Sequence, residues 1–433
     1  MSDWKEYTLG DISRNISRRF DFNAYPNVVF INTGDVLNNK FLHCDISNIK
    51  DLPGQAKKAI KKGDILYSEI RPGNGRYLFV DKDLDNYVVS TKFMVIEPNI
   101  NVVLPEFLFL LLISNETTEY FKMIAESRSG TFPQITFDSV SSLSLNIPDK
   151  ETQQKILDII TPLDDKIELN TQINQTLEQT AQALFKSWFV DFDPVRAKVQ
   201  ALSDGLSLEQ AELAAMQAIS GKTSEELTAL SQTQPDRYAE LAETAKAFPC
   251  EMVEVDGVEV PKEWEVKRID EVIQKIPVGK KYSSKTAFSE GLVPILDQGR
   301  SGVIGYHNDK PGVKASIEDP IIVFANHTCY MRLISYDFSA IQNVFAFKGK
   351  ECNLYWLYLA TLGKQEFVEY KGHFPDFLIK EIIVPPEELT ELFGKYVKES
   401  FSKIFINDRE NSNLAKIRDL LLPKLLNGGI QNE

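Results

Sequence analysis

Two long stretches with the same spacing of apolar residues constrain the fold more than any other feature of this chain. In each stretch, apolar residues or asparagines recur at alternating steps of three and four, the heptad seam of a helix that packs against another helix. The first seam comprises Ile156, Ile160, Leu163, Ile167, Asn170, Asn174, Leu177, Ala181, Leu184 and Trp188. The second lies 237 residues later and comprises Phe393, Val397, Ser400, Ile404, Asn407, Asn411, Leu414, Arg418, Leu421 and Leu425, of which only Ser400 and Arg418 are neither apolar nor asparagine.

The shared offset predicts two copies of one helix, paired with each other as an antiparallel coiled coil. Asn170 aligns with Asn407, and Asn174 with Asn411; asparagines in such a seam fix the register of a helix pair at some cost in stability. Two unrelated amphipathic helices, or a partner helix from another chain, are the alternatives. Pairing within the chain is simpler, because the helices close the two halves of one duplicated sequence. Pro162 lies inside the first register, so we expect a kink or restart there.

The regions before the two helices also follow one plan. The corresponding pairs are Trp4–Asp11 and Trp264–Asp270, the strand at Ile65–Tyr67 and that at Ile321–Phe324, the strand through Tyr87–Ile96 and that at Asn343–Phe347, and the helical patterns Leu104–Ala125 and Leu354–Tyr370. We therefore predict an α+β fold in which two duplicated α/β domains are separated by two long helices with pseudo-twofold symmetry. The predicted segments are a first domain (1–148), its helix (149–193), a connector (194–262), a second domain (263–385) and its helix (386–433).

The connector is expected to contain two or three short acidic helices. A hairpin should follow them, with Asp256–Gly257 as its turn. Gly221–Thr223 imitates part of a phosphate-binding loop, but the required first glycine and the preceding strand are missing, so we predict a helix junction.

The net charge of −14 is unfavourable for nucleic-acid binding until it is localised. Pro194–Pro261 carries five basic and twelve acidic residues, whereas Gln55–Arg76 carries six basic and two acidic ones, and Gly279–Lys314 six basic and three acidic ones. Two positive patches at equivalent places favour contact with DNA over a merely solvated face. Arginine suits guanine, asparagine and glutamine suit adenine, and lysine suits phosphate. The candidates are Lys57, Lys58, Lys61, Lys62, Arg71, Asn74, Arg76, Lys280, Lys281, Lys285, Gln298, Arg300, His307, Lys310, Lys314, Asn326 and His327.

Patterns for catalysis, metal binding and membrane insertion are weak or missing. Glu369–Lys371 has the spacing of a nuclease motif, but it lies in a helical pattern. The sequence has no Asn-Pro-Pro-aromatic motif for base methylation. The four cysteines and four histidines are scattered, which indicates reduced thiols and no zinc site. A charged amino terminus, and no apolar run of about 18 residues, predict a cytoplasmic protein.

These features together resemble the specificity subunit of a type I restriction–modification system. The sharpest matches are Ala183–Val195 (ALFKSWFVDFDPV), after the first helix, and Leu420–Gly428 (LLLPKLLNG), at the end of the second. Arg71–Gly75 and Ser129–Gln134 resemble segments of the family's target-recognition domains. In the second domain, Gly372–Asp376 departs from the Gly-Thr-x-x-Gln pattern.

The resemblance implies that each target-recognition domain recognises one half of a split sequence in double-stranded DNA. The helices would set the gap between the halves and dock two modification (methyltransferase) subunits. Those subunits would bind S-adenosylmethionine and methylate adenine at N6, and restriction subunits would add cleavage that depends on ATP and Mg. This chain would bind no cofactor or metal and would catalyse nothing. A self-contained restriction endonuclease and a duplicated scaffold that binds only protein are the alternatives.

Overall fold

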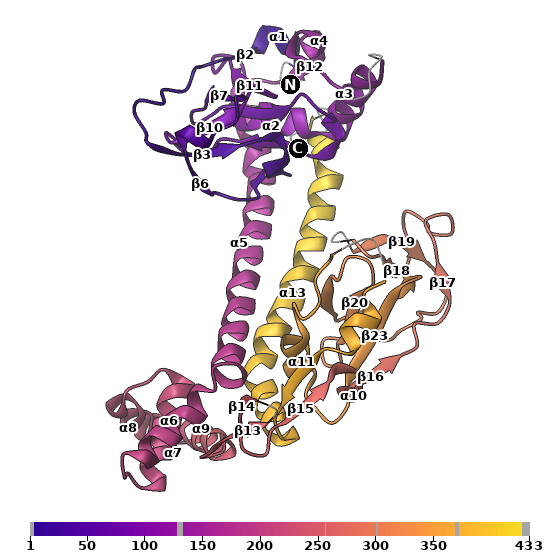
Figure 1. Cartoon of the computed structure of the whole chain (residues 1–433). Helices are drawn as coiled ribbons and strands as arrows, with labels where there is room; N and C mark the ends of the chain where they lie inside the picture. Colours follow the sequence, from indigo (N-terminus) through magenta and orange to yellow (C-terminus); the bar gives the residue numbers. More distant parts are fainter. Residues whose placement is uncertain (1–3, 128–132, 256, 300–301, 369–371, 427–433) are drawn as a thin grey trace. The chain divides into compact units, whose positions relative to one another are not determined.

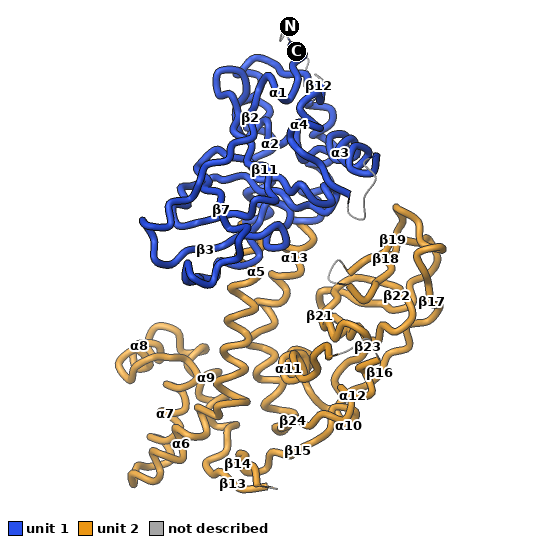
Figure 2. The backbone as a smooth tube through the Cα atoms, turned by 45° about the horizontal axis from the view of Figure 1, so that its top comes forward, with its two compact units in different colours: residues 1–168, 411–433 blue, residues 169–410 orange. Residues whose placement is uncertain are grey.

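A computed structural model describes residues 4–127, 133–255, 257–299, 302–368 and 372–426 (Figure 1). The chain forms two compact units, one of residues 1–168 and 411–433 and the other of residues 169–410 (Figure 2). Two helices of 40 residues each contribute to both units: α5 (Lys150–Phe189) and α13 (Glu387–Leu426). Among the described residues, no helix combines the length and the hydrophobicity needed to cross a bilayer.

The α/β domain of the first unit contains two four-stranded sheets. One is antiparallel throughout, with the order β2 (Ser13–Asn15), β11 (Phe93–Pro98), β8 (Ile65–Ser68) and β9 (Tyr77–Phe79). The other has the order β6 (Ile46–Asn48), β3 (Asn27–Ile31), β10 (Tyr87–Ser90) and β7 (Ala56–Ala59), and its β3–β10 pair is parallel. β1 (Lys5–Thr8) pairs with β12 (Ser144–Ile147) just before α5.

The core of the first unit joins the first sheet to six helices of the described residues, including both long helices. α2 (Pro105–Ile113) is apolar around most of its surface because both the sheet and other helices cover it, and six of its residues are buried. Ile156 and Ile160 of α5 and Leu425 of α13 belong to the same cluster. The remaining elements of this domain are α1 (Leu9–Ile12), η1 (Thr33–Asp35), β4 (Val36–Leu37), β5 (Lys40–Phe41), η2 (Ile49–Asp51), η3 (Pro72–Asn74), α3 (Asn115–Ser127) and α4 (Phe137–Val140).

The domain of the second unit repeats this plan. Its antiparallel sheet has the order β16 (Ile273–Ile276), β23 (Val344–Gly349), β20 (Ile321–Ala325) and β21 (Met331–Ile334), which matches the first sheet strand for strand. A second sheet has the order β17 (Lys281–Tyr282), β22 (Ser339–Ile341), β18 (Val293–Leu296) and β19 (Val303–His307). β15 (Glu265–Arg268) pairs with β24 (Glu381–Val384) just before α13, as β1 pairs with β12. The predicted duplication is confirmed. The short helices here are α10 (Ile269–Val272), α11 (Leu354–Thr361) and α12 (Phe374–Leu378).

The connector holds four helices rather than the predicted two or three. They are α6 (Asp193–Ser203), α7 (Leu208–Ser220), α8 (Ser224–Thr233) and α9 (Pro235–Ala247). The first long helix was predicted to reach residue 193, but α5 ends at Phe189. Pro194 lies in the first turn of α6, where proline is tolerated. Gly221 ends α7 at a φ of 66° and Thr223 caps α8, which confirms the predicted helix junction. The predicted hairpin is formed by β13 (Met252–Val255) and β14 (Val258–Pro261).

The long helices pair in antiparallel orientation. In the second unit, Asn170 donates to Glu410 at 2.8 Å, and the rings of Phe185 and Phe393 are 5.9 Å apart. In the first unit, the Arg418 guanidinium donates to Asp164 at 2.7 Å. The one arginine at a seam position thus forms an ion pair between the two helices. The predicted seam residues range from half-buried to fully buried, and the buried ones are Ile156, Ile160, Asn170, Ala181, Trp188, Phe393, Val397, Asn407 and Leu425. The half-buried ones are Leu163, Ile167, Asn174, Leu177, Leu184, Ile404, Asn411, Leu414 and Leu421.

The predicted restart at Pro162 was wrong, because α5 is one helix through this position. Pro162 and Asp158 are both exposed. Water can therefore solvate the Asp158 carbonyl that the proline leaves without an intrahelical donor.

Three other predicted elements are divided or shortened. The pattern Leu104–Ala125 forms two helices, because Ser114 ends α2 and its hydroxyl accepts the Thr117 N–H of α3. Tyr87–Ile96 forms two strands, β10 and β11, which belong to different sheets. The helix predicted at Leu354–Tyr370 is shorter in the structure. It is α11, which ends at Thr361, close to Gly363 with its φ of 74°.

Candidate nucleic-acid interface

In the first domain, the structure brings together two segments that are far apart in the sequence. The loop after β8 pairs with the segment before α4: the Arg71 N–H donates to the Pro133 carbonyl at 3.0 Å, and Ile70 bridges to Gln134. These are two of the segments that carry the family resemblance. Residues 128–132, the remainder of the second segment, lie outside the described residues.

The loop that carries Arg71 and Asn74 is held by its own backbone geometry. Arg71 is exposed and has a left-handed conformation with a φ of 48°. Gly75 has a φ of 68°, and a Cβ atom there would lie 2.2 Å from the Asn38 side-chain oxygen. Asn74 is exposed as well. A positioned, exposed arginine and amide fit groups that contact base edges.

Two predicted DNA-binding residues of the first domain are used inside the protein. Lys58 is 7% exposed and its amine donates to the Phe93 carbonyl at 2.7 Å; burial lowers the pKa of Lys58. Arg76 donates to the carbonyls of Gly34 and Val36, both at 2.7 Å. The structure therefore gives both residues a structural role, and a contact of either with DNA stays a prediction.

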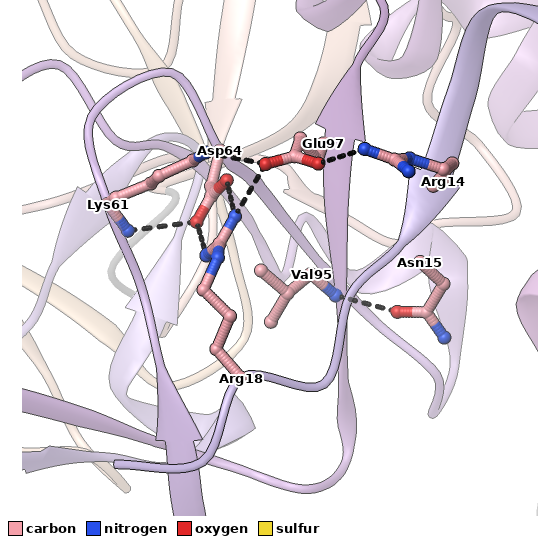
Figure 3. A network of polar contacts seen from close by, with 7 residues as sticks. All are labelled: Arg14, Asn15, Arg18, Lys61, Asp64, Val95 and Glu97. Atoms are coloured by element: carbon pink, nitrogen blue, oxygen red, sulfur yellow. Dashed lines mark hydrogen bonds and ion pairs between the residues drawn. The ribbon is translucent and has the colours of Figure 1, made fainter. Parts of the chain in front are cut away.

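Lys61 belongs to a network of three cations and two carboxylates (Figure 3). Its amine lies 2.6 Å from Glu97, which also accepts from Arg14 at 2.9 Å and Arg18 at 3.0 Å. Arg18 forms a second ion pair with Asp64, which directly precedes β8. The hydrogen bond from Lys61, followed by those from Arg18 and Arg14, lowers the pKa of Glu97 to about 2.

The predicted basic patch Gln55–Arg76 therefore does not form one surface. Lys61 precedes β8, whereas Arg71 follows it, so the two lie beyond opposite ends of this strand. Lys57 and Lys62 are exposed. Much of the charge of Lys61 is balanced by Glu97, so the Arg71 loop is the stronger candidate for contact with DNA.

The second domain builds the same relationship from a different sequence. The loop after β20 contacts the segment that begins α12: the His373 N–H donates to the Asn326 carbonyl at 2.9 Å, and the Phe374 N–H donates to Asn326 Oδ1 at 2.8 Å. Gly372–Asp376 thus occupies the place of the Gly-Thr-x-x-Gln segment despite its departure from that pattern. Asn326 is buried and positions this junction, so it has a structural role rather than the predicted base contact.

His307 also has a structural role. It is 2% exposed, stacks on Tyr282 with 4.2 Å between ring centroids, and lies 2.9 Å from the Ser339 hydroxyl. Its Nδ1 atom accepts the Asp309 N–H at 3.0 Å. Burial lowers the pKa of His307, which favours the neutral ring. The predicted contact with DNA therefore does not suit this residue.

The other candidates of the second domain differ in their surroundings. Gln298 Oε1 accepts the His327 N–H at 2.8 Å, so these two predicted residues come together. Lys280 pairs with Asp309 at 3.0 Å. Lys281, Lys285, Lys310 and Lys314 are exposed, and Arg300 lies outside the described residues. Whether these side chains contact DNA stays a prediction.

Several polar and charged residues beside the junction of the second domain are not among the predicted contacts. Lys275 lies 5.5 Å from the Phe374 ring centroid, and Arg332 lies 5.7 Å from that of Tyr330. Lys364 and Glu366 are exposed on the segment after α11. Their charges lie outside the basic run Gly279–Lys314, so no local pattern marked them. Among the described residues, no cluster of three or more His, Cys, Asp or Glu side chains could hold a metal ion.

Comparison with known proteins places the chain in a family. Residues 1–179 match the model of the type I restriction modification DNA specificity domain. The HindI specificity subunit of Haemophilus influenzae is 66% identical over 99% of this chain and 100% of its own length. The MjaIX specificity subunit of Methanocaldococcus jannaschii is 27% identical over 76% of this chain and 70% of its own.

A solved structure agrees in fold. The crystal structure of the S subunit of a type I restriction-modification system from M. genitalium has a TM-score of 0.50 and 15% sequence identity, with 98% of this chain and 96% of that chain covered. Given the duplicated domains, the paired helices and the identity shared with the HindI specificity subunit, this chain belongs to the family of type I restriction enzyme specificity subunits.

Proposed function

We propose that this chain selects the DNA sequence on which a type I restriction–modification enzyme acts, each domain recognising one half of a bipartite site. One observation carries the proposal: both domains place a loop at the end of the same buried strand, β8 or β20, against the segment before the same short helix. Two equivalent loops on one chain fit two half-sites in one duplex. The identity with the HindI specificity subunit supports this role.

The paired helices would set the gap between the half-sites. A helix of 40 residues spans about 60 Å at about 1.5 Å per residue, and one turn of DNA is about 34 Å. Polar contacts inside the pair, such as that of Asn174 with Asn407, hold one register. One fixed register of the two helices would give one fixed gap between the two half-sites.

The enzyme needs further subunits for its chemistry. The same helices would dock two modification subunits, which bind S-adenosylmethionine and methylate adenine at N6. Restriction subunits would supply cleavage that depends on ATP and Mg. The role of this chain is recognition of double-stranded DNA in the cytoplasm, without a cofactor or metal of its own.

An exchange of domains tests the proposal. Residues 1–148 are replaced by the first domain of a specificity subunit with a different known target, and methylated adenines are mapped by sequencing the host DNA. Only one half of the methylated sequence should change. The reciprocal exchange of residues 263–385 should change only the other half. A change in both halves, or in neither, would reject modular recognition.

Two experiments separate the proposal from its alternatives. The purified chain incubated with duplex DNA and Mg should leave the DNA intact, whereas a self-contained endonuclease would cleave it. The chain bound to its modification subunits should retard duplex DNA in a gel, whereas a scaffold that binds only protein would not.

A further inference from the structure

A pocket of about 370 Å³ lies beside the candidate interface of the second domain. It is lined by Thr328, Cys329 and Tyr330 from the loop after β20, and by Gln365, Glu366 and Phe367 from the segment after α11. The first set borders the junction of Asn326 with Phe374 described above. The pocket therefore belongs to the surface that corresponds to the Arg71 loop of the first domain.

The wall formed by Gln365 and Glu366 presents hydrogen-bond acceptors. Glu366 is exposed and lines the pocket. The Gln365 amide nitrogen donates to the Glu366 carbonyl at 3.0 Å. That bond fixes which end of the amide is oxygen, because a flipped amide would oppose two oxygens. Gln365 Oε1 is enclosed and accepts no hydrogen bond from the described residues.

Cations and aromatic rings surround this acceptor wall. Lys364 is exposed next to Gln365, Arg332 lies over the Tyr330 ring at 5.7 Å, and Phe367 is 56% exposed. The cations suit phosphates. The carboxylate does not, because phosphate is anionic and offers no donor.

The chemistry of DNA restricts what such a wall can bind. Phosphate and deoxyribose oxygens inside a strand only accept hydrogen bonds. The donors that a protein can reach in the major groove are the amino groups of adenine N6 and cytosine N4, and the minor groove adds guanine N2. The exposed Glu366 carboxylate therefore matches a base that carries an exocyclic amino group.

We propose that Glu366, with Gln365 behind it, selects a base with an exocyclic amino group in the half-site of the second domain. The inference rests on the proposed function and names the chemistry of one position. Glu366 makes the contact because it is exposed, and Gln365 Oε1 is a second acceptor, enclosed beside it and without a donor among the described residues. Neither residue is among those that the basic patches predicted.

The test uses the chain in complex with its modification subunits and duplexes that contain its methylated sequence. In the second half-site, each adenine is replaced in turn by purine, each cytosine by the analogue without its 4-amino group, and each guanine by hypoxanthine, which lacks the 2-amino group. One replacement should weaken binding to the wild-type complex by about 10-fold or more. In Glu366→Ala, the same replacement should have little further effect, while affinity for DNA of unrelated sequence rises because a negative charge is removed.

Controls keep the outcomes distinct. Gln274→Leu changes an exposed glutamine of β16 and should leave the profile of sensitive positions unchanged. Gln365→Leu should weaken discrimination at the same position as Glu366→Ala. If no replacement impairs the wild-type complex, or if Glu366→Ala keeps the full sensitivity at every position, the inference is wrong. A wild-type complex that methylates no bipartite sequence would instead overturn the proposed function.

Discussion

The side-chain amide of Asn407 donates a hydrogen bond of 2.8 Å to Oδ1 of Asn174, between the two long helices of the second unit. The Asn174 amide nitrogen in turn donates to Asp408 at 2.7 Å, so both ends of this amide are occupied. Asn407 is fully buried. A slip of one helix by a turn would separate these groups and bury them opposite apolar residues, which makes the present register the preferred one.

The pair of Asn174 and Asn407 should favour one register of the two long helices, but should lower the free energy of unfolding relative to an apolar pair. Asn407→Leu leaves Asn174 Oδ1 without its donor and should lower the free energy of unfolding by about 1–2 kcal/mol. The double variant Asn174→Leu with Asn407→Leu should recover that loss. It should also allow more than one gap length in the methylated sequence, because the register is no longer fixed. Urea denaturation and mapping of methylated adenines are the measurements. Gln179→Leu, at an exposed position of α5, is the control, and an unchanged gap in the double variant would contradict a role in register.

Arg71 and Arg76 should separate DNA binding from stability. Arg71→Ala should weaken binding of the specific duplex by about 1–3 kcal/mol and relax only the half-site of the first domain. Arg76→Ala should leave the base preference intact and lower the melting temperature, because two backbone carbonyls lose their donor. Equilibrium binding and calorimetry distinguish the two. A loss of base preference in Arg76→Ala, with Arg71→Ala unaffected, would reverse these roles.

The network around Glu97 should make the first unit sensitive to acid. The folded pKa of Glu97 is about 2, below the value of 4.5 for an unperturbed glutamate. Its contribution to stability is therefore complete above about pH 4.5 and is lost as the pH falls toward 2. Glu97→Gln should cost about 1–2 kcal/mol at neutral pH and reduce the loss of stability in that window. Denaturant titrations from pH 7 to 2 test this, and parallel curves for both proteins would refute it.

His307 should make the free energy of unfolding depend on pH in a second range, higher than that of Glu97. Burial lowers its folded pKa below 6.5, so the unfolded chain binds the proton more readily. The stability that comes from the neutral ring is complete above about pH 6.5 and declines as the pH falls below that value. His307→Gln should remove this dependence. NMR titration of the ring, together with unfolding at pH 7.5 and 5.5, gives the measurement, and a folded pKa above 6.5 would contradict it.

The elements that could best be predicted from the sequence were the long helices, whose apolar residues recur at a regular spacing. The steps of three and four through Ile160 and Val397 predicted both long helices, because the side chains that face a partner recur within a few residues. The repeated offset also predicted that the two domains share one plan. Pro162 misled the prediction because its effect depends on exposure, and exposure is set by the rest of the fold.

The candidate site was less predictable, because a charged residue type does not reveal whether the side chain is exposed to DNA or is buried against other parts of the chain. Lys58 and Lys57 are neighbours on β7, yet their alternation across the strand buries the first and exposes the second. Arg71 and Arg76 belong to one basic run, but only tertiary contacts give Arg76 its backbone acceptors. The pocket at Glu366 joins segments from two loops, and no local motif marks such a meeting.

The first unit is completed by α13, since Leu421 and Leu425 pack against its core although they follow it by more than 250 residues. During synthesis, a ribosome therefore releases residues 1–168 long before the segment that covers their apolar surface. Residues 169–410 can close on themselves earlier. A ribosome that stalls before Leu421 would therefore leave a product whose first domain lacks the apolar cover that α13 supplies, while residues 169–410 are complete.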